Sequence, residues 1–467
     1  MKIIYSVEVK KSNTTPPPFE GAWGGMNWTQ LLSGKRLGVE NYHERKHERT
    51  NFQRDYDRLI FSSPFRRLQN KTQVFPLPGS IFVHNRLTHS LEVSCVGRSL
   101  GKNVSSYLNR KYNNPDNVNF SEIDSIVSAA CLAHDMGNPP FGHSGERALS
   151  AYFADGKGKE FEQTIRDEGG RWEDFLYFEG NANVMRLLTH QFKGRREGGF
   201  ALTYSTLAAV VKYPYSSLYS YPKGKFGYFQ TEEETYLRIV NELGIPKIDT
   251  EKDIYARYPL VFLVEAADDI CYQIMDIEDA HKLRLLTKQE VYDLFLEFFR
   301  GKRLEDIEKT IKMVNDTNEQ ISYLRSCIIG LLVDECTQVF MDNEESLLRG
   351  TYNIPLIEGV SDIVQNAFRI CSEAAYNKIY VSRDVVDVEL AGYHIFGYLL
   401  ETMIDAMMNP NHSYSKLLLN RVPEQYDVHA PTIYGKLQCA LDYISGMTDV
   451  YALDLYRKIT GQSLPAV

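Results

Sequence analysis

Two adjacent residues of metal-ligand type, His134 and Asp135, stand at the end of an apolar segment with helical spacing. Gly137 and the proline-rich stretch from Asn138 are expected to end this helix. The pair would then lie where the free carbonyl groups of a helix C-terminus favour a nearby cation. A His-Asp pair is more often an ordinary hydrogen-bonded couple, so a metal site requires further ligands elsewhere in the chain.

Further candidate ligands lie on two other segments. His89 lies in RLTHSLEV, on a predicted helix with a buried apolar side, where a single histidine is usually a core residue. In EAADDICYQIMDIEDA, the residues Asp268, Tyr272 and Asp276 recur every four positions and therefore share one helical face. Acids beside an apolar interior are costly to bury without a cation or hydrogen-bond partners. A metal ion explains their presence there.

Four of these residues form a mixed nitrogen and oxygen ligand set: His89, His134, Asp135 and Asp268. Such a set suits Mn²⁺, Mg²⁺, Co²⁺, Ni²⁺ or Fe²⁺ and leaves two positions open on an octahedral ion. Those positions can hold water and a phosphate oxygen. The chemistry indicated is metal-assisted attack on phosphorus.

The elements that must position these residues are predicted to be helices. Apolar spacing of three and four indicates helices over 121–136, 144–153, 181–190, 201–211, 232–243, 259–283, 288–298, 303–336 and several segments after 356. Strand signals are confined to 225–230 and the first ten residues. The predicted fold class is all-α, with a helical core, a helical C-terminal extension and at most a few short strands.

Length and composition limit the classes of protein to which this chain can belong. The chain has 467 residues, 43% of them apolar, and no stretch approaches the roughly 20 uncharged apolar residues of a membrane span. Its seven cysteines are scattered and odd in number, which favours buried free thiols in a reducing cytoplasm. A net charge of -9 argues against broad nucleic-acid binding, although a local basic groove remains compatible with it. We expect a cytoplasmic protein that does not bind membranes.

Seven collinear motifs resemble one family. They are RDYDRLIFSSPFRRLQNKTQVF, NRLTHSLEV, AACLAHDMGNPPFGHSGE, FEGNAN, LTYSTLAAVVKYP, KFGYF and EAADDICYQIMDIEDA. Together they resemble the dGTPase-like branch of the HD-domain phosphohydrolases, the deoxynucleoside triphosphate triphosphohydrolases. The likeness runs from about residue 45 to 285 and is only general beyond that. It predicts an N-terminal extension over 1–25, natural or added for expression, an HD phosphohydrolase core over 26–285, and a helical region over 286–467 packed on that core.

The resemblance implies an enzyme that hydrolyses dGTP to deoxynucleoside and inorganic tripolyphosphate, with other dNTPs left open as substrates. It implies one divalent metal ion per subunit, Mn²⁺ or Mg²⁺ before Co²⁺, Ni²⁺ or Fe²⁺. His143 and Glu146 match the catalytic dyad of the family, in which the histidine acts near the α-phosphate and the acid orients it. From spacing alone they would be a loop histidine and a first-turn acid.

The resemblance also implies contacts to the triphosphate. Lys212 in VVKYP and Lys225 in KGKFGYF match phosphate-contacting lysines, with Tyr213 beside them; otherwise they would be solvated surface residues. Arg86 lies three residues, about one helical turn, before His89 and can bind a phosphate oxygen. Asn138 matches a polar position near the triphosphate, and a helix-capping role is equally compatible with its place.

Sugar recognition is assigned to three residues. A Tyr272 ring packed against C2′ would leave no room for a ribose hydroxyl, and Asp276 can accept a hydrogen bond from the 3′-OH. Gln73 in KTQVF resembles another sugar contact. Otherwise Tyr272 would be a filler of the core and Asp276 a surface acid.

Two alternatives remain open at this stage. The chain could catalyse another HD-superfamily nucleotide reaction, or it could be a nucleic-acid-regulated dNTP-sensing assembly. The resemblance implies a homo-oligomer, hexamer or tetramer, with single-stranded DNA or a dNTP as a candidate effector. Base preference, the physiological metal and, without the family match, the choice between Asp268 and Asp269 as ligand are not determined by the sequence.

Overall fold

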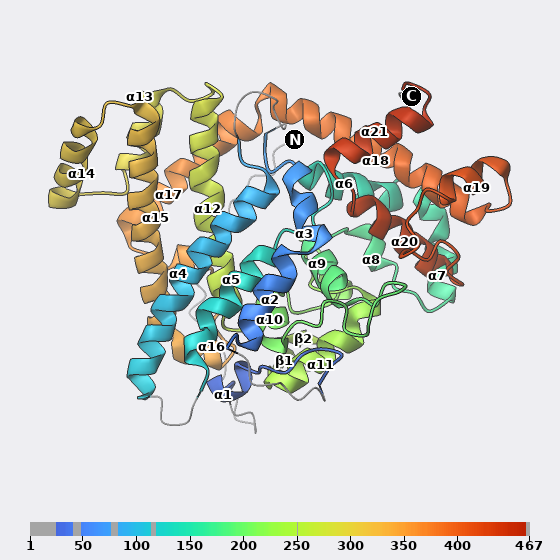
Figure 1. Ribbon diagram of the computed structural model, residues 1–467, viewed down its shortest axis with the longest axis horizontal. Helices are drawn as coiled ribbons and strands as arrows, with labels where there is room; N and C mark the ends of the chain where they lie inside the picture. The colour runs from blue at the N-terminus through green and yellow to red at the C-terminus, as the bar shows by residue number, and fades with distance from the viewer. Residues whose placement is uncertain (1–24, 41–47, 76–82, 114–117, 250, 464–467) are drawn as a thin grey trace.

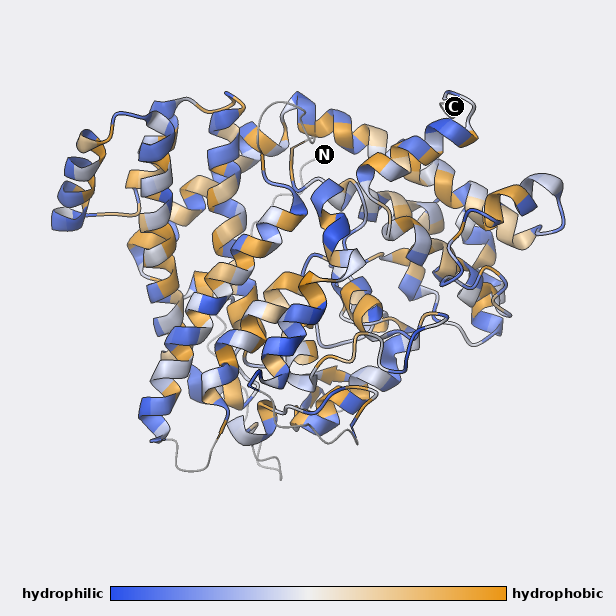
Figure 2. Cartoon of the chain, viewed as in Figure 1, coloured by the Kyte–Doolittle hydropathy of each residue, from blue (hydrophilic) through white to orange (hydrophobic). Residues whose placement is uncertain are grey.

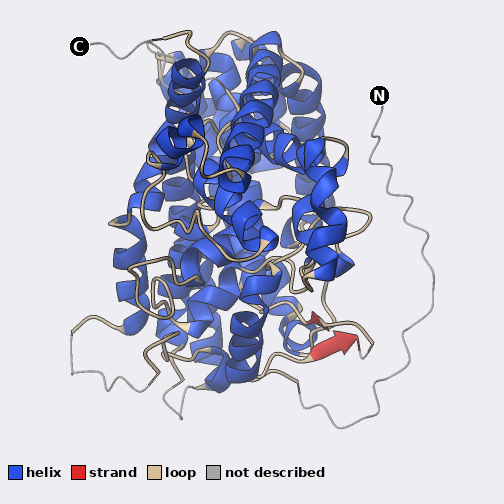
Figure 3. Ribbon diagram, turned by 90° about the vertical axis from the view of Figure 1, so that its right-hand side faces the viewer, coloured by secondary structure: helices blue, strands red, loops and turns tan. Residues whose placement is uncertain are grey.

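The structure, a computed structural model, describes residues 25–40, 48–75, 83–113, 118–249 and 251–463. Helices make up almost all of its regular structure (Figure 3). Within the described ranges a single two-stranded antiparallel sheet occurs, β1 (Lys247–Asp249) with β2 (Ile254–Tyr255). The predicted all-α class is confirmed. None of the helices in these ranges is both long and apolar enough to cross a membrane.

Figure 1 shows the helices in chain order. The α-helices are α1 (Trp28–Leu31), α2 (Asn51–Ile60), α3 (Ser63–Arg67), α4 (Arg86–Tyr112), α5 (Ile123–Ala133), α6 (Gly142–Ala154), α7 (Glu162–Asp167), α8 (Glu173–Leu176), α9 (Gly180–Thr189), α10 (Tyr204–Val210), α11 (Glu233–Leu243), α12 (Val261–Lys282), α13 (Lys288–Leu296), α14 (Gly301–Met313), α15 (Thr317–Asp342), α16 (Glu344–Leu348), α17 (Asp362–Ala375), α18 (Arg383–Met408), α19 (Ser413–Leu419), α20 (Ile433–Ser445) and α21 (Asp449–Ile459). Short 3₁₀ turns are η1 (Leu68–Asn70), η2 (Phe120–Glu122), η3 (Lys157–Phe161), η4 (Ser217–Tyr219), η5 (Gln230–Glu232) and η6 (Leu356–Glu358), and one π-helical turn is η7 (Tyr376–Tyr380).

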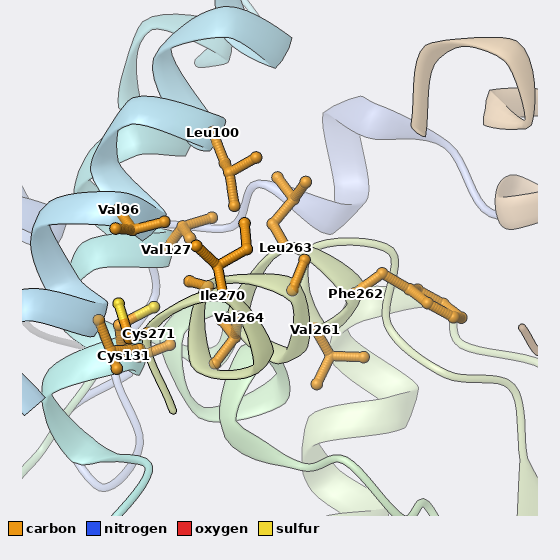
Figure 4. Packing of buried hydrophobic residues seen from close by; sticks show 14 of the residues in the cluster. Val96, Leu100, Val127, Cys131, Val261, Phe262, Leu263, Val264, Ile270 and Cys271 are labelled. Atoms are coloured by element: carbon orange, nitrogen blue, oxygen red, sulfur yellow. The ribbon is translucent and has the colours of Figure 1, made fainter. Parts of the chain in front are cut away.

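Three helices, α4, α5 and α12, form the centre of the main core (Figure 4). A capping box starts α4, because Asn85 and Thr88 exchange side-chain to backbone hydrogen bonds. Gly97 lets α4 approach α5 closely: a Cβ atom there would lie 2.5 Å from the Cys131 sulfur. This close packing holds the start of α4 beside the end of α5.

The C-terminal region takes part in two hydrophobic clusters. Helices α13 to α17 bury apolar side chains in the same cluster as α4, α5 and α12. Helices α18 to α21 form a second cluster with α6 and α8, for example through Leu149, Phe396 and Leu437. Figure 2 shows the alternation of hydrophilic and hydrophobic residues that gives these helices one buried side. The chain after residue 286 therefore packs against α4, α5 and α12 in one cluster and against α6 and α8 in the other.

The structure corrects two element predictions and adds a short sheet that was not predicted. Residues 225–230 are not a strand: Tyr228 makes only an isolated bridge to Ser216, and Phe226 and Phe229 are buried in a small aromatic cluster instead. The helix predicted over 303–336 is two helices, α14 and α15, because Asp316 caps a new helix after a break. The sequence did not predict β1 and β2. The strand considered for the first ten residues lies outside the described ranges.

The cysteines agree with the sequence-based prediction of free thiols. All seven are free. Five are buried, whereas Cys327 is partly exposed and Cys95 is exposed on α4.

Candidate active site

A cluster of histidine and aspartate side chains lies where α4, α5 and α12 meet. The candidate ligand atoms of His89, His134 and Asp135 all lie within 4.8 Å of one another. Asp268 on α12 joins them: its Oδ1 is 3.0 Å from Nε2 of His89 and 3.5 Å from Nε2 of His134. The four residues predicted to bind metal are thus brought together from three helices.

The protonation pattern of His134 fits a metal ligand. Its Nδ1 donates a hydrogen bond of 2.6 Å to the carbonyl of Cys131, which leaves Nε2 as the nitrogen whose lone pair a cation can bind once its proton is displaced. That Nε2 is buried and has no hydrogen-bond partner. Burial lowers the pKa of His134, but Asp135 and Asp268 outweigh this and raise it to about 9. A cation would satisfy the lone pair and both carboxylates at once.

The geometry distinguishes Asp268 from its neighbour Asp269. Asp268 contacts both histidines, and they hold its pKa well below the usual range despite burial. Burial raises the pKa of Asp269 to about 7, and Asp269 is not among the residues that line the main cavity. Asp268 is therefore the carboxylate placed to bind a cation.

A histidine and glutamate pair lies beside the cluster at the start of α6. His143 Nδ1 is 2.9 Å from Oε2 of Glu146, and Oε1 of the same carboxylate accepts a bond of 3.0 Å from the Gly180 amide. The helix begins at Gly142, two residues before the predicted start at residue 144. Glu146 is buried, and although burial raises its pKa, His143 lowers it overall. The Glu146 carboxylate thus fixes one imidazole nitrogen and leaves Nε2 free to act on a ligand.

The turn before His143 is held by the C-terminal region. Asp449, at the start of α21, accepts hydrogen bonds from the amides of Phe141 at 3.0 Å and Thr72 at 2.9 Å. Phe141 has a φ of +59°, a left-handed conformation that is unfavourable for a bulky residue. Asp449 therefore holds a strained turn and the segment that bears Gln73.

A cavity of about 210 Å³ connects these groups. Twelve of the fourteen predicted site residues line it: Gln73, Arg86, His134, Asp135, Asn138, His143, Glu146, Lys212, Tyr213, Lys225, Asp268 and Tyr272. His89 and Asp276 are not part of the lining. His89 lies behind Asp268, to which it is hydrogen bonded.

The two candidate phosphate-binding lysines are paired with buried carboxylates. Lys212 lies 3.0 Å from Glu265, and Lys225 lies 2.7 Å from Glu179. Burial lowers the pKa of each lysine, but the partner carboxylate raises it overall, so both are charged. The side chain of Tyr213 lies under Lys212, whose ammonium is 5.9 Å from the ring centre. Neither lysine is the solvated surface residue that composition alone would favour.

Two further polar groups face the cavity without a complete set of partners. Arg86 donates to Asp135 at 2.8 Å, but its Nε is buried and has no hydrogen-bond partner. Gln73 has a buried Oε1 that is equally unpartnered. Asn138 donates from its side chain to Asp135, so it orients that carboxylate.

The residues assigned to the sugar form a layer with a residue of the C-terminal region. The Tyr272 ring stacks on Tyr380 of η7, with centroids 6.0 Å apart. The Tyr380 hydroxyl donates to Asp276 at 2.7 Å. Burial raises the pKa of Asp276 to about 7. Asp276 is thus a buried acid with a tyrosine partner, not a surface residue.

Comparison with known proteins agrees with this arrangement. The HD domain model matches residues 86–212, and the phosphohydrolase-associated domain model matches residues 359–458. A deoxyguanosinetriphosphate triphosphohydrolase-like protein of Pseudomonas aeruginosa is 37% identical over 454 residues, covering 94% of this chain and 100% of the relative. A protein of the same name from Synechocystis is 37% identical over 451 residues, with the same coverage of 94% and 100%.

The chain belongs to the deoxyguanosinetriphosphate triphosphohydrolase-like family of HD-domain phosphohydrolases. A more distant relative, the deoxyguanosinetriphosphate triphosphohydrolase of Yersinia enterocolitica, is 29% identical over 521 residues, covering 93% of this chain and 99% of the relative. The predicted family is confirmed. An HD domain implies a divalent metal, and His89, His134 and Asp135 are the group in this family member that could hold it.

Four residues of the family member's site were missed by the sequence-based reasoning. Glu179 and Glu265 pair with the two lysines, Tyr380 contacts Asp276, and Asp449 holds the turn before the dyad. Glu179 lies in the FEGNAN motif, which indicated its neighbourhood but no role. Glu265 likewise opens the motif EAADDICYQIMDIEDA, but no local signal marks Tyr380 and Asp449, because each reaches its partner from a distant part of the chain.

Proposed function

We propose that this chain hydrolyses deoxynucleoside triphosphates, with dGTP favoured, to the deoxynucleoside and inorganic tripolyphosphate. One observation carries the proposal: three buried polar atoms without partners surround the same cavity, and each requires a different ligand group. Nε2 of His134 offers a lone pair to a cation, Nε of Arg86 offers a proton to an anion, and Oε1 of Gln73 accepts from a hydroxyl. A metal-bound nucleoside triphosphate supplies all three groups.

The triphosphate would be held by the two lysines. In the free protein they neutralise Glu265 and Glu179, so each ammonium is already partly desolvated and held at the cavity. Phosphate oxygens can share these ammonium groups, since each lysine has three donors. Arg86 would add a further charged contact close to the metal ligands.

The residues near the scissile bond would act as follows. His89, His134, Asp135 and Asp268 would hold a divalent ion, which when bound supplies a Lewis acid to a phosphate oxygen. Glu146 fixes the proton on Nδ1 of His143, so the opposite nitrogen can move a proton or attack at the α-phosphorus. The mixed donors favour Mn²⁺ or Mg²⁺, with Co²⁺, Ni²⁺ and Fe²⁺ as alternatives.

Selection of the deoxy sugar would depend on the tyrosine layer. Tyr272 lines the cavity and is backed by Tyr380, so its ring has little freedom to move away from a 2′-hydroxyl. Asp276 would exchange its Tyr380 contact for, or share it with, the 3′-hydroxyl. The homo-oligomer, a single-stranded DNA or dNTP effector and the cytoplasmic location stay predictions.

Product analysis tests the proposal directly. Purified protein is incubated with each dNTP and with GTP, in Mn²⁺ or Mg²⁺, and nucleoside, monophosphate, diphosphate and tripolyphosphate are separated. We expect deoxynucleoside with intact tripolyphosphate, dGTP to be hydrolysed fastest, and GTP to be stable. Monophosphate with pyrophosphate would instead identify a different HD-domain reaction. Turnover that requires single-stranded DNA or a second nucleotide would identify a regulated assembly.

A further inference from the structure

A second, smaller cavity lies behind the loop that carries Asn138. It is lined by α3, the segment after α9, the α19–α20 connection and the end of α20, and its volume is about 20 Å³ against about 210 Å³ for the main site. It is separate from the metal ligands and from every residue assigned to the nucleotide. Its size excludes a base and sugar.

Three cationic side chains converge on this cavity: Arg67, Lys71 and Arg195. The described residues place no carboxylate in ion-pair contact with any of them. Asp442 also lines the cavity, but both of its oxygens accept bonds of 2.7 Å from Arg186. Arg195 is covered by aromatic faces, with its guanidinium carbon 5.4 Å from the Phe200 ring centre. The lining therefore carries three basic side chains and one acidic side chain.

Two of these cations are poorly hydrated as well as unpaired. Lys71 is 2% exposed, and its ammonium donates only to the neutral carbonyls of Asn138 at 2.6 Å and Ser445 at 2.9 Å. Burial lowers the pKa of Lys71 to about 7, and the charge of Arg67 adds to this effect. Burial likewise lowers the pKa of Arg67, whose guanidinium makes no hydrogen bond or ion pair with a described residue. Lys71 is buried and Arg67 is half-buried, and a cation without a counter-ion is costly in such surroundings, so an anion would reduce that cost.

We propose that this cavity binds one phosphate-type oxyanion, held by Arg67, Lys71 and Arg195. Tetrahedral oxyanions match the forked donors of arginine and the point charge of lysine, whereas a carboxylate partner from the chain is lacking. The ion is either free inorganic phosphate or the terminal group of a polyphosphate. Because Lys71 also holds the Asn138 carbonyl, the bound anion stabilises the loop between the metal ligands and the catalytic dyad.

The first test locates the ion. Crystals of the full chain are grown in arsenate, and the arsenic positions are found from anomalous differences. We expect a peak between the Arg67 guanidinium and the Lys71 ammonium. Arsenic confined to the main cavity near Lys212 would overturn the proposal.

The second test compares two neighbouring arginines by thermal unfolding, in phosphate and in chloride of matched ionic strength. Arg67→Gln removes a ligand of the proposed site, whereas Arg66→Gln alters an exposed arginine that lies over Phe61 and outside the cavity. Both variants keep the main site, so phosphate bound there raises the thermal stability of both by the same amount. We expect phosphate to stabilise the wild type and Arg66→Gln, with affinity weakened on the order of tenfold or more in Arg67→Gln.

The same comparison separates binding from a structural role. In chloride, Arg67→Gln should be about as stable as the wild type, because it removes an unpaired charge that is half-buried. Equal destabilisation in both salts, or an undiminished response to phosphate, would overturn the proposal. Repeating the titration with tripolyphosphate distinguishes the sources: an Arg67-dependent response to inorganic phosphate supports the free ion, and a response to tripolyphosphate alone supports the terminal group.

Discussion

His134 has two nitrogens with separate tasks, and this separation sets the chemistry of the site. One nitrogen is fixed by the Cys131 carbonyl, and the other faces two carboxylates without a hydrogen-bond partner. His143 repeats the arrangement with Glu146 as the fixing group. The first imidazole is thus prepared for a cation and the second for proton transfer or attack, which variants can separate.

We predict that His134→Ala and Asp268→Ala lose both metal and turnover, whereas His143→Ala keeps the metal. The first two remove ligand atoms, but His143 hydrogen bonds to Glu146 and, among the described residues, to none of the candidate metal ligands. Loss of general acid-base catalysis should slow the His143 variant by about 10² to 10⁴. Metal content after dialysis and hydrolysis rates on the same samples check this. Full activity of metal-free His134→Ala would contradict the assignment.

We also predict that Tyr272→Ala relaxes discrimination between dGTP and GTP. Its ring is the group placed to exclude a 2′-hydroxyl, and removing it opens space beside Tyr380. The ratio of kcat/KM values for the two nucleotides should fall by roughly 10- to 100-fold. Val261→Ala, a substitution elsewhere in the same lining, serves as the control. An unchanged ratio in Tyr272→Ala would remove the proposed role.

At the scale of elements, the start of α4 is tied to the end of α12 by a buried histidine. His84 Nδ1 is 2.7 Å from Asp279, and Nε2 is 3.1 Å from Glu92. Burial lowers the pKa of His84, but hydrogen bonds to the two acids outweigh it and raise the pKa to about 10. This contact fixes the position at which Arg86 and His89 enter the site.

The raised pKa predicts a pH-dependent stability. The folded pKa lies above the ordinary value of 6.5, so the stabilisation is complete below about pH 6.5 and is lost as pH rises towards 10. His84→Gln should abolish a decline in unfolding free energy on the order of 4 kcal/mol across this range. Urea unfolding at pH 6.5 to 10 measures it, with His281→Gln on α12 as the control. An identical pH profile for His84→Gln and the wild type would refute it.

Helices were predictable from the sequence where apolar spacing and caps agree, as in α5 and α12. The break before α15 was not, because neither glycine nor proline marks it and only the cap at Asp316 starts the new helix. The segment around Tyr228 has strand-like residues, but no neighbouring strand completes a ladder. The candidate site residues within the motifs could be predicted from the sequence, because each motif is a short continuous segment. Tyr380 and Asp449 were not, since tertiary packing alone brings them to the site.

At the scale of the whole molecule, the C-terminal region completes the active site. Arg186 of α9 joins Glu232 to Asp442 of α20 in a buried ionic network, with contacts of 2.7 to 2.8 Å. Lys71 bonds the end of α20, and Asp449 of α21 bonds the turn before His143. The region matched by the phosphohydrolase-associated model thus contributes to positioning as well as to packing.

We therefore predict that Asp449→Ala impairs turnover although Asp449 does not line the cavity. The substitution leaves the amides of Thr72 and Phe141 without acceptors, at a cost of about 1 to 3 kcal/mol each. The strained Phe141 turn should relax and displace His143, lowering kcat by roughly 10²-fold. Asp454→Ala, which removes only an ion pair with Lys458 on the same helix, should change neither stability nor rate appreciably. Rates are measured where urea unfolding shows both variants fully folded. A kcat for Asp449→Ala within twofold of the wild type would show that the C-terminal region packs against the site without positioning its dyad.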